Sequence, residues 1–294
     1  MNVKPILKWA GGKSKLVPAI EARIPEKFRS VKFTYVEPFF GGGAMFFWLK
    51  NNFKIEHAII NDVNPDLVNC YKVVQRQVND LIEALHDYQD KYRKASGDKS
   101  TKAELFYNVR TAFNSKTSGD VKRAAQLIFL NKTCFNGLYR VNRKGEFNVP
   151  IGSYKNPTIC DPDNIKRVSK VFQDTTILNG DYKETLNHVN ADTESLFYFD
   201  PPYKPVNSTS SFNAYAKGGF NDDEQVRLSQ FCRQLDEKSI SWILSNSDVD
   251  SPGNPNKFFD SLYEGFDIRR VQASRAINSV SSKRGKLNEL LISN

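Results

Sequence analysis

The sequence predicts an α/β protein with an open, largely parallel sheet that is interrupted by a helical insertion. Short β-like runs that end in a carboxylate or amide side chain occur in the first 62 residues and again after residue 175. The residues between them carry helical spacing of apolar side chains and many charges. Two further β-like runs near the carboxyl terminus predict an antiparallel pair that closes the sheet.

These patterns predict each element in turn. We expect a short parallel strand that ends near Glu37, further parallel strands at 57–62, 176–181, 195–199 and 239–246, and the closing pair at 266–271 and 287–292. Helices are expected at 44–51, 66–94, 101–115 and 120–129. We therefore divide the chain into a discontinuous α/β domain, residues 1–64 and 176–294, and an inserted helical domain, residues 65–175.

Composition limits the classes of protein that this chain can be. With 294 residues, of which 39% are hydrophobic, it can bury a full core. A net charge of +9 permits a polyanionic partner, although a basic protein without such a partner is the alternative. Four scattered cysteines without a C-x-x-C pair, and three histidines, indicate no zinc cluster and no disulfide framework. We expect a cytoplasmic protein without a metal, a signal peptide or a membrane span.

The run Asp200-Pro201-Pro202-Tyr203 is the main candidate for a catalytic site. It follows the compact aromatic run 195–199, and two prolines end that strand because neither can donate to a sheet ladder. Ligands of open α/β sheets bind beyond the carboxyl ends of the strands. An acid and an aromatic ring on a stiff backbone are therefore expected at such a crevice.

This arrangement suits methyl transfer to the amino group of adenine. That nitrogen is a poor nucleophile because its lone pair is delocalised into the ring. The Asp200 carboxylate and the Pro201 carbonyl can accept both amino hydrogens, while Tyr203 stacks on the base. The alternative is a strand followed by a loop with a surface aspartate and a packed tyrosine.

The amino-terminal run from Lys8 to Ser14 ends like a phosphate-binding loop. Leu7 stands where the first glycine of that pattern belongs, and no strand precedes the run, which argues against a nucleoside triphosphatase. A turn with the Trp9 ring and the Lys13 ammonium suits a ligand with a purine at one end and a carboxylate at the other. The alternative is a structural tryptophan beside a Gly-Gly turn.

A second glycine turn, 39–43, lies between an expected strand and an expected helix. Such a turn lets a ligand approach the backbone, but it lacks the G-x-G-x-x-G pattern of dinucleotide-binding enzymes. Asp62, one strand further on, is placed to bind a ribose hydroxyl pair, and a solvated strand-end acid is the alternative. Together with Glu37, Asp181, Asp200 and Asn246, it predicts polar groups along one edge of the sheet.

The end of the insertion predicts an exposed basic hairpin, at about 134–150. β-formers flank Asn136-Gly137 and again Lys144-Gly145, and basic and apolar side chains alternate between them. Such a hairpin can contact guanine through arginine and open a base step with an apolar wedge, whereas a charged surface hairpin is the alternative. Near the carboxyl terminus, Arg275 and Lys283 either contact phosphates or are simply solvated.

Taken together, K-W-x-G-G-K (8–13), P-F-x-G-G-G (38–43) and D-P-P-Y (200–203), with F-N-G-L-Y-R-V-N and F-N-V-P in the insertion, resemble the Dam-type DNA adenine-N6 methyltransferases. The resemblance spans nearly the whole chain. It implies a Rossmann-like S-adenosylmethionine-dependent methyltransferase domain and an inserted target-recognition domain. It also implies duplex DNA as substrate, a flipped adenine within G-A-T-C, and S-adenosylhomocysteine as the product of the cofactor.

Motif residues and strand-end acids together define the candidate sites. The expected catalytic residues are Asp200, Pro201, Pro202 and Tyr203. The expected cofactor-binding residues are Trp9, Ala10, Gly11, Lys13, Glu37, Pro38, Phe39, Gly41, Gly43, Asp62, Asp181 and Asp200. The expected DNA-binding residues are Lys8, Phe135, Asn136, Leu138, Arg140, Pro150, Tyr154, Arg275 and Lys283.

Three other activities stay open at this point. A cytosine-N4 methyltransferase shares the logic but typically carries serine in place of Asp200, and a structured-RNA methyltransferase would also be basic. A catalytically silent DNA-binding protein would explain the hairpin but not the strand-end acids. A cytosine-C5 enzyme is disfavoured because the chain has no Pro-Cys pair. The sequence leaves open a solitary enzyme or one with a cognate restriction endonuclease, in a prokaryotic or phage-encoded setting.

Overall fold

The computed structural model describes residues 2–11, 13, 16–95, 97–204, 220–248, 257–274 and 286–294. The chain divides into two compact units, each built from several segments. Unit 1 comprises Met1–Gly12, Gly41–Asn52 and Asp62–Gly180, and unit 2 comprises Lys13–Phe40, Phe53–Asn61 and Asp181–Asn294. The domain boundaries at residues 64 and 176 stay a prediction.

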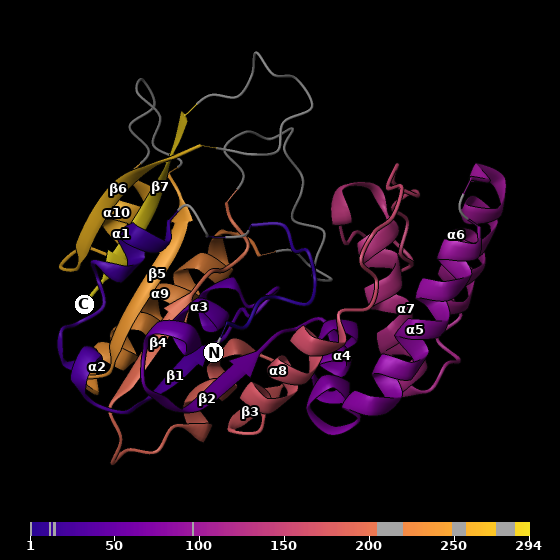
Figure 1. The fold of residues 1–294 in the computed structure, drawn as a ribbon. Coiled ribbons are helices and arrows are strands. Elements are labelled where there is room, and N and C mark those ends of the chain that lie inside the picture. Colours follow the sequence, from indigo (N-terminus) through magenta and orange to yellow (C-terminus); the bar gives the residue numbers. More distant parts are fainter. Residues whose placement is uncertain are drawn as a thin grey trace. The chain divides into compact units, whose positions relative to one another are not determined.

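Unit 2 contains a mixed sheet with a parallel centre. Its strands are β1 (Phe33–Glu37), β2 (Ile55–Asn61), β4 (Ser195–Phe199), β5 (Ser241–Ser247), β6 (Asp267–Ser274) and β7 (Lys286–Ser293). They run in the order β2-β1-β4-β5-β7-β6 (Figure 1). β1 is parallel to β2 and β4, and β4 is parallel to β5, whereas β7 is antiparallel to β5 and β6. The α/β class and the closing antiparallel pair are therefore confirmed.

The central strands form because their side chains are apolar on both faces. Every residue of β1 and of β4 is buried. Phe197 of β4 lies opposite Val36 on one side and Trp242 on the other. Strands buried on both faces are typical of parallel sheets, and their carboxyl ends share one edge. Glu37 and Asp200 consequently lie at the same edge, as the sequence predicts.

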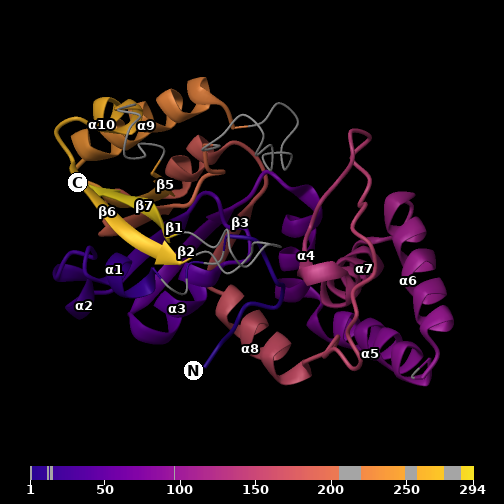
Figure 2. The ribbon, with the colours of Figure 1, turned by 90° about the horizontal axis from the view of Figure 1, so that it is seen from above.

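Helices flank both sides of this sheet. Figure 2 shows α9 (Asp222–Glu237) and α10 (Phe258–Leu262) on one side, and α1 (Val17–Glu21) and α2 (Lys27–Ser30) on the other. The short 3₁₀ helix η2 (Tyr182–His188) also belongs to unit 2. α9 is not among the predicted helices, although its buried Leu228, Phe231, Cys232 and Leu235 have helical spacing.

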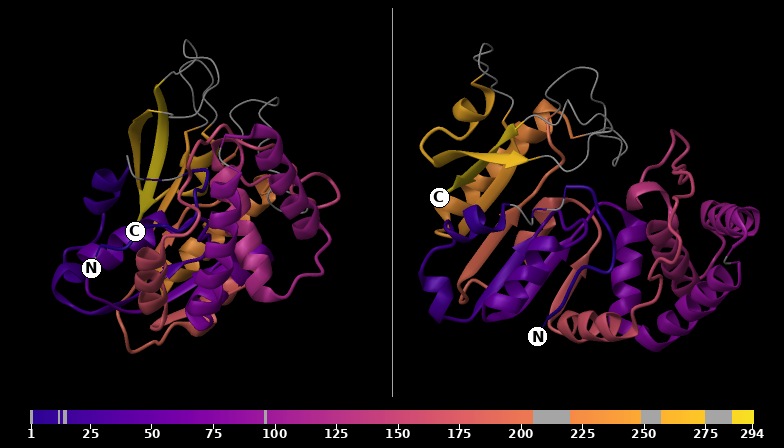
Figure 3. Two further views of the ribbon diagram at one scale, coloured as in Figure 1. Left: turned by 45° about the vertical axis from the view of Figure 1, so that its right-hand side comes forward. Right: turned by 45° about the horizontal axis from the view of Figure 1, so that its top comes forward.

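Unit 1 is mainly helical. It contains α3 (Ala44–Asn52), α4 (Pro65–Arg76), α5 (Val78–Lys94), α6 (Lys99–Asn114), α7 (Asp120–Thr133), η1 (Phe135–Gly137), α8 (Pro162–Phe172) and the strand β3 (Thr175–Leu178). α7 contacts α4, α5 and α6, so it forms the centre of this helical group (Figure 3). The predicted helix 66–94 is two helices, because Gln77 leaves helical geometry at φ −135° and ψ 45°. α8 was not predicted.

The segment after α7 differs from a regular hairpin. Two isolated antiparallel bridges, Cys134↔Ile151 and Val141↔Phe147, join its two sides. The sequence Asn136-Gly137 lies in η1, where Asn136 adopts a φ of 54°, and Gly145 forms part of the tip with a φ of 75°. A hairpin with two paired strands stays a prediction.

In the described part of the chain, none of the helices is both long and apolar enough to cross a membrane.

Candidate active site

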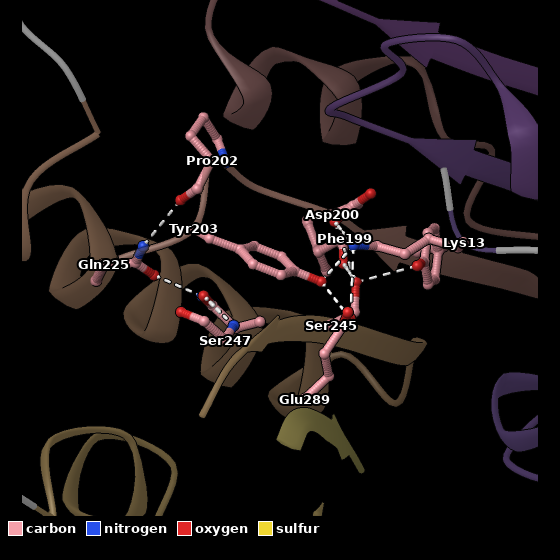
Figure 4. A network of polar contacts seen from close by, with 11 residues as sticks. Lys13, Phe199, Asp200, Pro202, Tyr203, Gln225, Ser245, Ser247 and Glu289 are labelled. Carbon is pink, nitrogen blue, oxygen red and sulfur yellow. Dashed lines mark hydrogen bonds and ion pairs between the residues drawn. The ribbon is translucent and has the colours of Figure 1, made fainter. Parts of the chain in front are cut away.

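Asp200 follows the last residue of β4 and is held by two neighbours. Its Oδ1 lies 3.0 Å from Nζ of Lys13 and accepts a hydrogen bond of 3.2 Å from the hydroxyl of Ser245 on β5. Figure 4 shows these groups converging on the carboxylate. Among the described residues, Oδ2 has no hydrogen-bond partner, and 22% of the side chain is exposed. One oxygen is therefore anchored while the other can accept from a ligand.

The electrostatic environment of Asp200 opposes its ionisation. Burial raises the pKa of this carboxyl above its usual value of 3.8, and the negative charge of Glu289 raises it further. The Lys13 ammonium and its hydrogen bond lower the pKa, as does the hydrogen bond from Ser245. Lys13 is therefore the main group that keeps the carboxylate in its accepting form.

Tyr203 is held at its hydroxyl and through the backbone that precedes it. Its hydroxyl donates a 2.6 Å hydrogen bond to Oε2 of Glu289 and accepts one from Nζ of Lys13. The backbone that precedes Tyr203 is held as well, because the carbonyl of Pro202 accepts a hydrogen bond from Nε2 of Gln225 at 3.3 Å (Figure 4). Burial keeps the pKa of Tyr203 well above 10.0, so the phenol stays a donor.

Three further predicted residues lie in unit 2, at or directly after the end of β1. The buried Glu37 carboxylate accepts a 2.8 Å hydrogen bond from the hydroxyl of Tyr35, and the Pro38 carbonyl accepts one from Asn61. Phe39 packs against the rings of Tyr182 and Phe220, with centroids 5.1 and 5.5 Å away.

Asp181 forms an ion pair with Arg227 of α9, at 2.7 Å. Burial works to raise the pKa of Asp181, but the hydrogen bonds from Arg227 and from the backbone of Lys183 outweigh it and lower the pKa. Asp181 is thus ionised and already paired. A ligand hydroxyl would have to share this carboxylate with Arg227.

In unit 1, Trp9 packs directly on the glycine turn. A Cβ at Gly41 would lie 2.9 Å from Cδ1 of Trp9, and one at Gly42 would lie 2.7 Å from Cβ of Trp9. Gly41 and Gly43 also have φ values of 49° and 69°, which favour glycine. The glycines are therefore required by the tryptophan as well as by the turn.

Asp62 forms a hydrogen bond with the same glycine turn. Its Oδ2 accepts a 2.8 Å hydrogen bond from the amide of Gly41, and Oδ1 accepts one of 2.9 Å from Asn64. Burial raises the pKa of Asp62, while these backbone donors lower it in part. Ala10 and Gly11 form the turn that follows Trp9, and Gly11 has a φ of 88°.

Lys8 is built into the segment that follows α7. Its backbone exchanges two hydrogen bonds with the amide side chain of Asn131, at 2.8 and 2.7 Å. Its side chain crosses Gly137, where a Cβ would lie 2.5 Å from Cδ of Lys8, and ends 4.2 Å from the centroid of the Tyr154 ring. Lys8 and Tyr154 are thus brought together, although 146 positions separate them in the sequence.

The remaining predicted DNA-binding residues differ in exposure. Phe135 is 51% exposed, and its amide donates to the Pro150 carbonyl at 2.9 Å. Arg140 is exposed, and its Nε donates to Oδ1 of Asn148 at 2.8 Å. The Leu138 carbonyl accepts from the Cys134 thiol. Arg275 and Lys283 lie outside the described residues.

Sequence reasoning missed several residues of these clusters. Ser245, Glu289 and Arg227 were not predicted, nor was Tyr139, which stacks on Trp9 at 5.3 Å. The one available signal was the acid at position 289, directly before the apolar run Leu290-Leu291-Ile292. Within the described ranges, His, Cys, Asp and Glu side chains form no group of three that could hold a metal ion.

Comparisons with known proteins agree on one family. Residues 9–277 match the family model described as D12 class N6 adenine-specific DNA methyltransferase. The chain is 49% identical to the type II methyltransferase M.MjaIII of Methanocaldococcus jannaschii, with both chains covered completely. It is 38% identical to the type II methyltransferase M1.LlaDCHI of Lactococcus lactis, covering 100% of this chain and 96% of the relative. It is 35% identical to a DNA adenine methylase of Haemophilus influenzae, covering 98% and 92%.

Proposed function

The chain belongs to the D12 class of N6 adenine-specific DNA methyltransferases, and on that premise we propose that it is site-specific. Its proposed substrate is duplex DNA, its target is G-A-T-C, and the adenine is methylated after it has left the helix. The observation that carries the proposal is the open Oδ2 of Asp200, at the carboxyl end of a central parallel strand and beside Tyr203.

Asp200 and Pro201 prepare the nucleophile. Oδ2 of Asp200 and the Pro201 carbonyl, neither of which has a hydrogen-bond partner among the described residues, accept the two amino hydrogens of the adenine. Accepting both hydrogens returns electron density to the nitrogen. The Tyr203 ring stacks on the base and keeps the nitrogen in line with the methyl donor.

S-adenosylmethionine, which a methyltransferase of this family implies, supplies a methyl group activated by its sulfonium. The chain offers residues that fit its parts. In unit 1, Trp9 provides a ring beside the glycine turn and Asp62 provides a carboxylate for ribose hydroxyls. In unit 2, Lys13 provides a cation for the carboxylate of the methionine part, and Phe39 and Asp181 provide a ring and an acid. When the adenine nitrogen receives the methyl group it would lose one proton, and the Asp200 carboxylate would accept that proton.

The segment 134–151 is the proposed reader of the target. Its exposed Phe135 suits insertion where the adenine leaves the helix, with Asn136 beside it at a positive φ. Lys8, Leu138, Arg140, Pro150 and Tyr154 are the proposed contacts to the target bases and their phosphates. Because two similar proteins are named type II methyltransferases, we also propose a prokaryotic setting with a cognate restriction endonuclease as a partner.

Sequencing of modified bases in DNA from a host without its own adenine methylation, expressing this chain, tests the proposal. We expect N6-methyladenine confined to G-A-T-C, and no modification from the matched Asp200→Ala variant. Methylation at another adenine sequence would refute the target alone. Methylated cytosine, or methylation that persists in Asp200→Ala, would refute the chemistry.

A further inference from the structure

Glu289 is a half-buried carboxylate on the closing antiparallel strand. It lies on β7 opposite Ser247 of β5 and Val271 of β6, and the next three residues of its strand are buried leucines and an isoleucine. Polar partners offset the partial loss of solvation of such a carboxylate. Its partners are the hydroxyl of Tyr203, at 2.6 Å, and the ammonium of Lys13, at 3.7 Å.

These groups form a directed chain of hydrogen bonds. The Lys13 ammonium donates to the hydroxyl of Tyr203, and that hydroxyl donates its single proton to Glu289 (Figure 4). Charged groups at both ends strengthen such a chain, and they fix the direction of the phenol. With the Pro202 carbonyl bound by Gln225, the ring is held at its hydroxyl and through the backbone before it.

The negative charge of Glu289 does not favour the ionised form of Asp200. Two carboxylates, Asp200 and Glu289, face one ammonium, and Glu289 raises the pKa of Asp200. Because Asp200 has to be ionised to accept the amino hydrogens, the negative charge of Glu289 works against this role of Asp200. The contribution of Glu289 has to come through its other contact, the phenol of Tyr203.

We infer that Glu289 is a positioning residue that fixes the Tyr203 ring through its hydroxyl, so that the ring is already oriented when a base stacks on it. This inference rests on the proposed stacking role of Tyr203. A ring held in the reactive orientation keeps the amino nitrogen in line with the methyl donor, and this lowers the barrier of the bound complex. Loss of Glu289 should therefore lower kcat and leave KM nearly unchanged.

A double-mutant cycle tests this coupling. We expect Glu289→Gln and Tyr203→Phe each to lower kcat about tenfold, and the double variant to lose no more than either single variant, because both remove the same contact. The KM values for DNA and S-adenosylmethionine should stay within about twofold of wild type. Glu237→Gln, which removes a carboxylate from the exposed end of α9, should behave as wild type.

Multiplicative losses, about a hundredfold in the double variant, would overturn the inference, as would an unchanged kcat in Glu289→Gln. Fluorine NMR of the protein labelled with 3-fluorotyrosine gives a readout that does not need activity. The resonance that disappears in Tyr203→Phe should shift in Glu289→Gln and not in Glu237→Gln. If the resonance shifts in Glu289→Gln but the wild-type protein methylates no adenine, the contact between Tyr203 and Glu289 is supported and the proposed function is refuted. If the resonance does not shift, the contact is refuted.

Discussion

At the scale of single residues, the site depends on one half-buried acid, Asp200, whose negative charge is balanced by few neighbours. Asp200 loses solvation at the end of β4, and the Lys13 ammonium and a serine hydroxyl restore part of it. A protonated carboxyl is a weaker acceptor than a carboxylate, and it cannot take the proton that the amino nitrogen loses. The protonation of this single group should therefore set the acid side of the pH profile.

The pH profile of kcat should move in opposite directions in two variants. Because the pKa of Asp200 is raised, kcat should fall as the pH drops through that raised pKa. Lys13→Met removes the interaction that lowers the pKa, so the acid limb should move to higher pH. Glu289→Gln removes a like charge that raises it, so the acid limb should move to lower pH.

Single-turnover rates at saturating cofactor and DNA measure both profiles. Because the cofactor is saturating, a weaker affinity of Lys13→Met for it does not alter the measured pKa of Asp200. Shifts of the same sign in the two variants would contradict the assignment of the acid limb to Asp200.

At the scale of elements, the segment 134–151, whose two sides are joined by the bridges Cys134↔Ile151 and Val141↔Phe147, is anchored to the helical group of unit 1. Asn114 at the end of α6 exchanges two hydrogen bonds with the backbone of Phe147, at 3.0 and 2.8 Å. Buried Phe147 and Val149 fix one side, while Phe135 and Arg140 stay exposed. The segment is thus rigid at its base and presents polar and aromatic side chains outward.

Arg140→Ala should lower discrimination between G-A-T-C and a site with an altered guanine by about 1–3 kcal/mol, as for the loss of a bidentate base contact. Arg143→Ala is the matched control, since it removes the same charge three residues away. We expect it to weaken both sites in parallel. Methylation rates on the two duplexes decide the matter, and a parallel loss in Arg140→Ala would make that residue a phosphate anchor.

At the scale of the whole chain, the net charge of +9 matches a polyanionic substrate. Phosphate contacts release counterions from DNA, so binding weakens in proportion to the number of such contacts as salt rises. The family assignment makes DNA that substrate.

The KM for duplex DNA should rise steeply between about 50 and 200 mM salt, by orders of magnitude if several phosphates are contacted. The KM for S-adenosylmethionine should change far less over the same range, and it serves as the internal control. Steady-state rates on one short duplex measure both. Equal responses of the two KM values would indicate general inactivation by salt instead of counterion release.

Sequence patterns predicted the strands best where they are short, apolar and bounded by turn residues. The run 195–199 coincides with β4, and its carboxyl end holds Asp200 as expected, because two prolines can only end a strand. Helix limits were predicted less well. Gln77 splits one predicted helix although no glycine or proline marks the break, and α8 and α9 were missed.

By itself, the sequence determined the family, the α/β class and the acid at the centre of the proposed chemistry, because motif residues and strand ends are local features of the chain. Only the tertiary structure decided which groups surround that acid. Glu289 reaches Tyr203 across 86 positions, and Lys13 reaches it across 190. Pairing of β7 beside β5 places Glu289, and strand pairing depends on the fold of the whole sheet, which local sequence patterns do not encode.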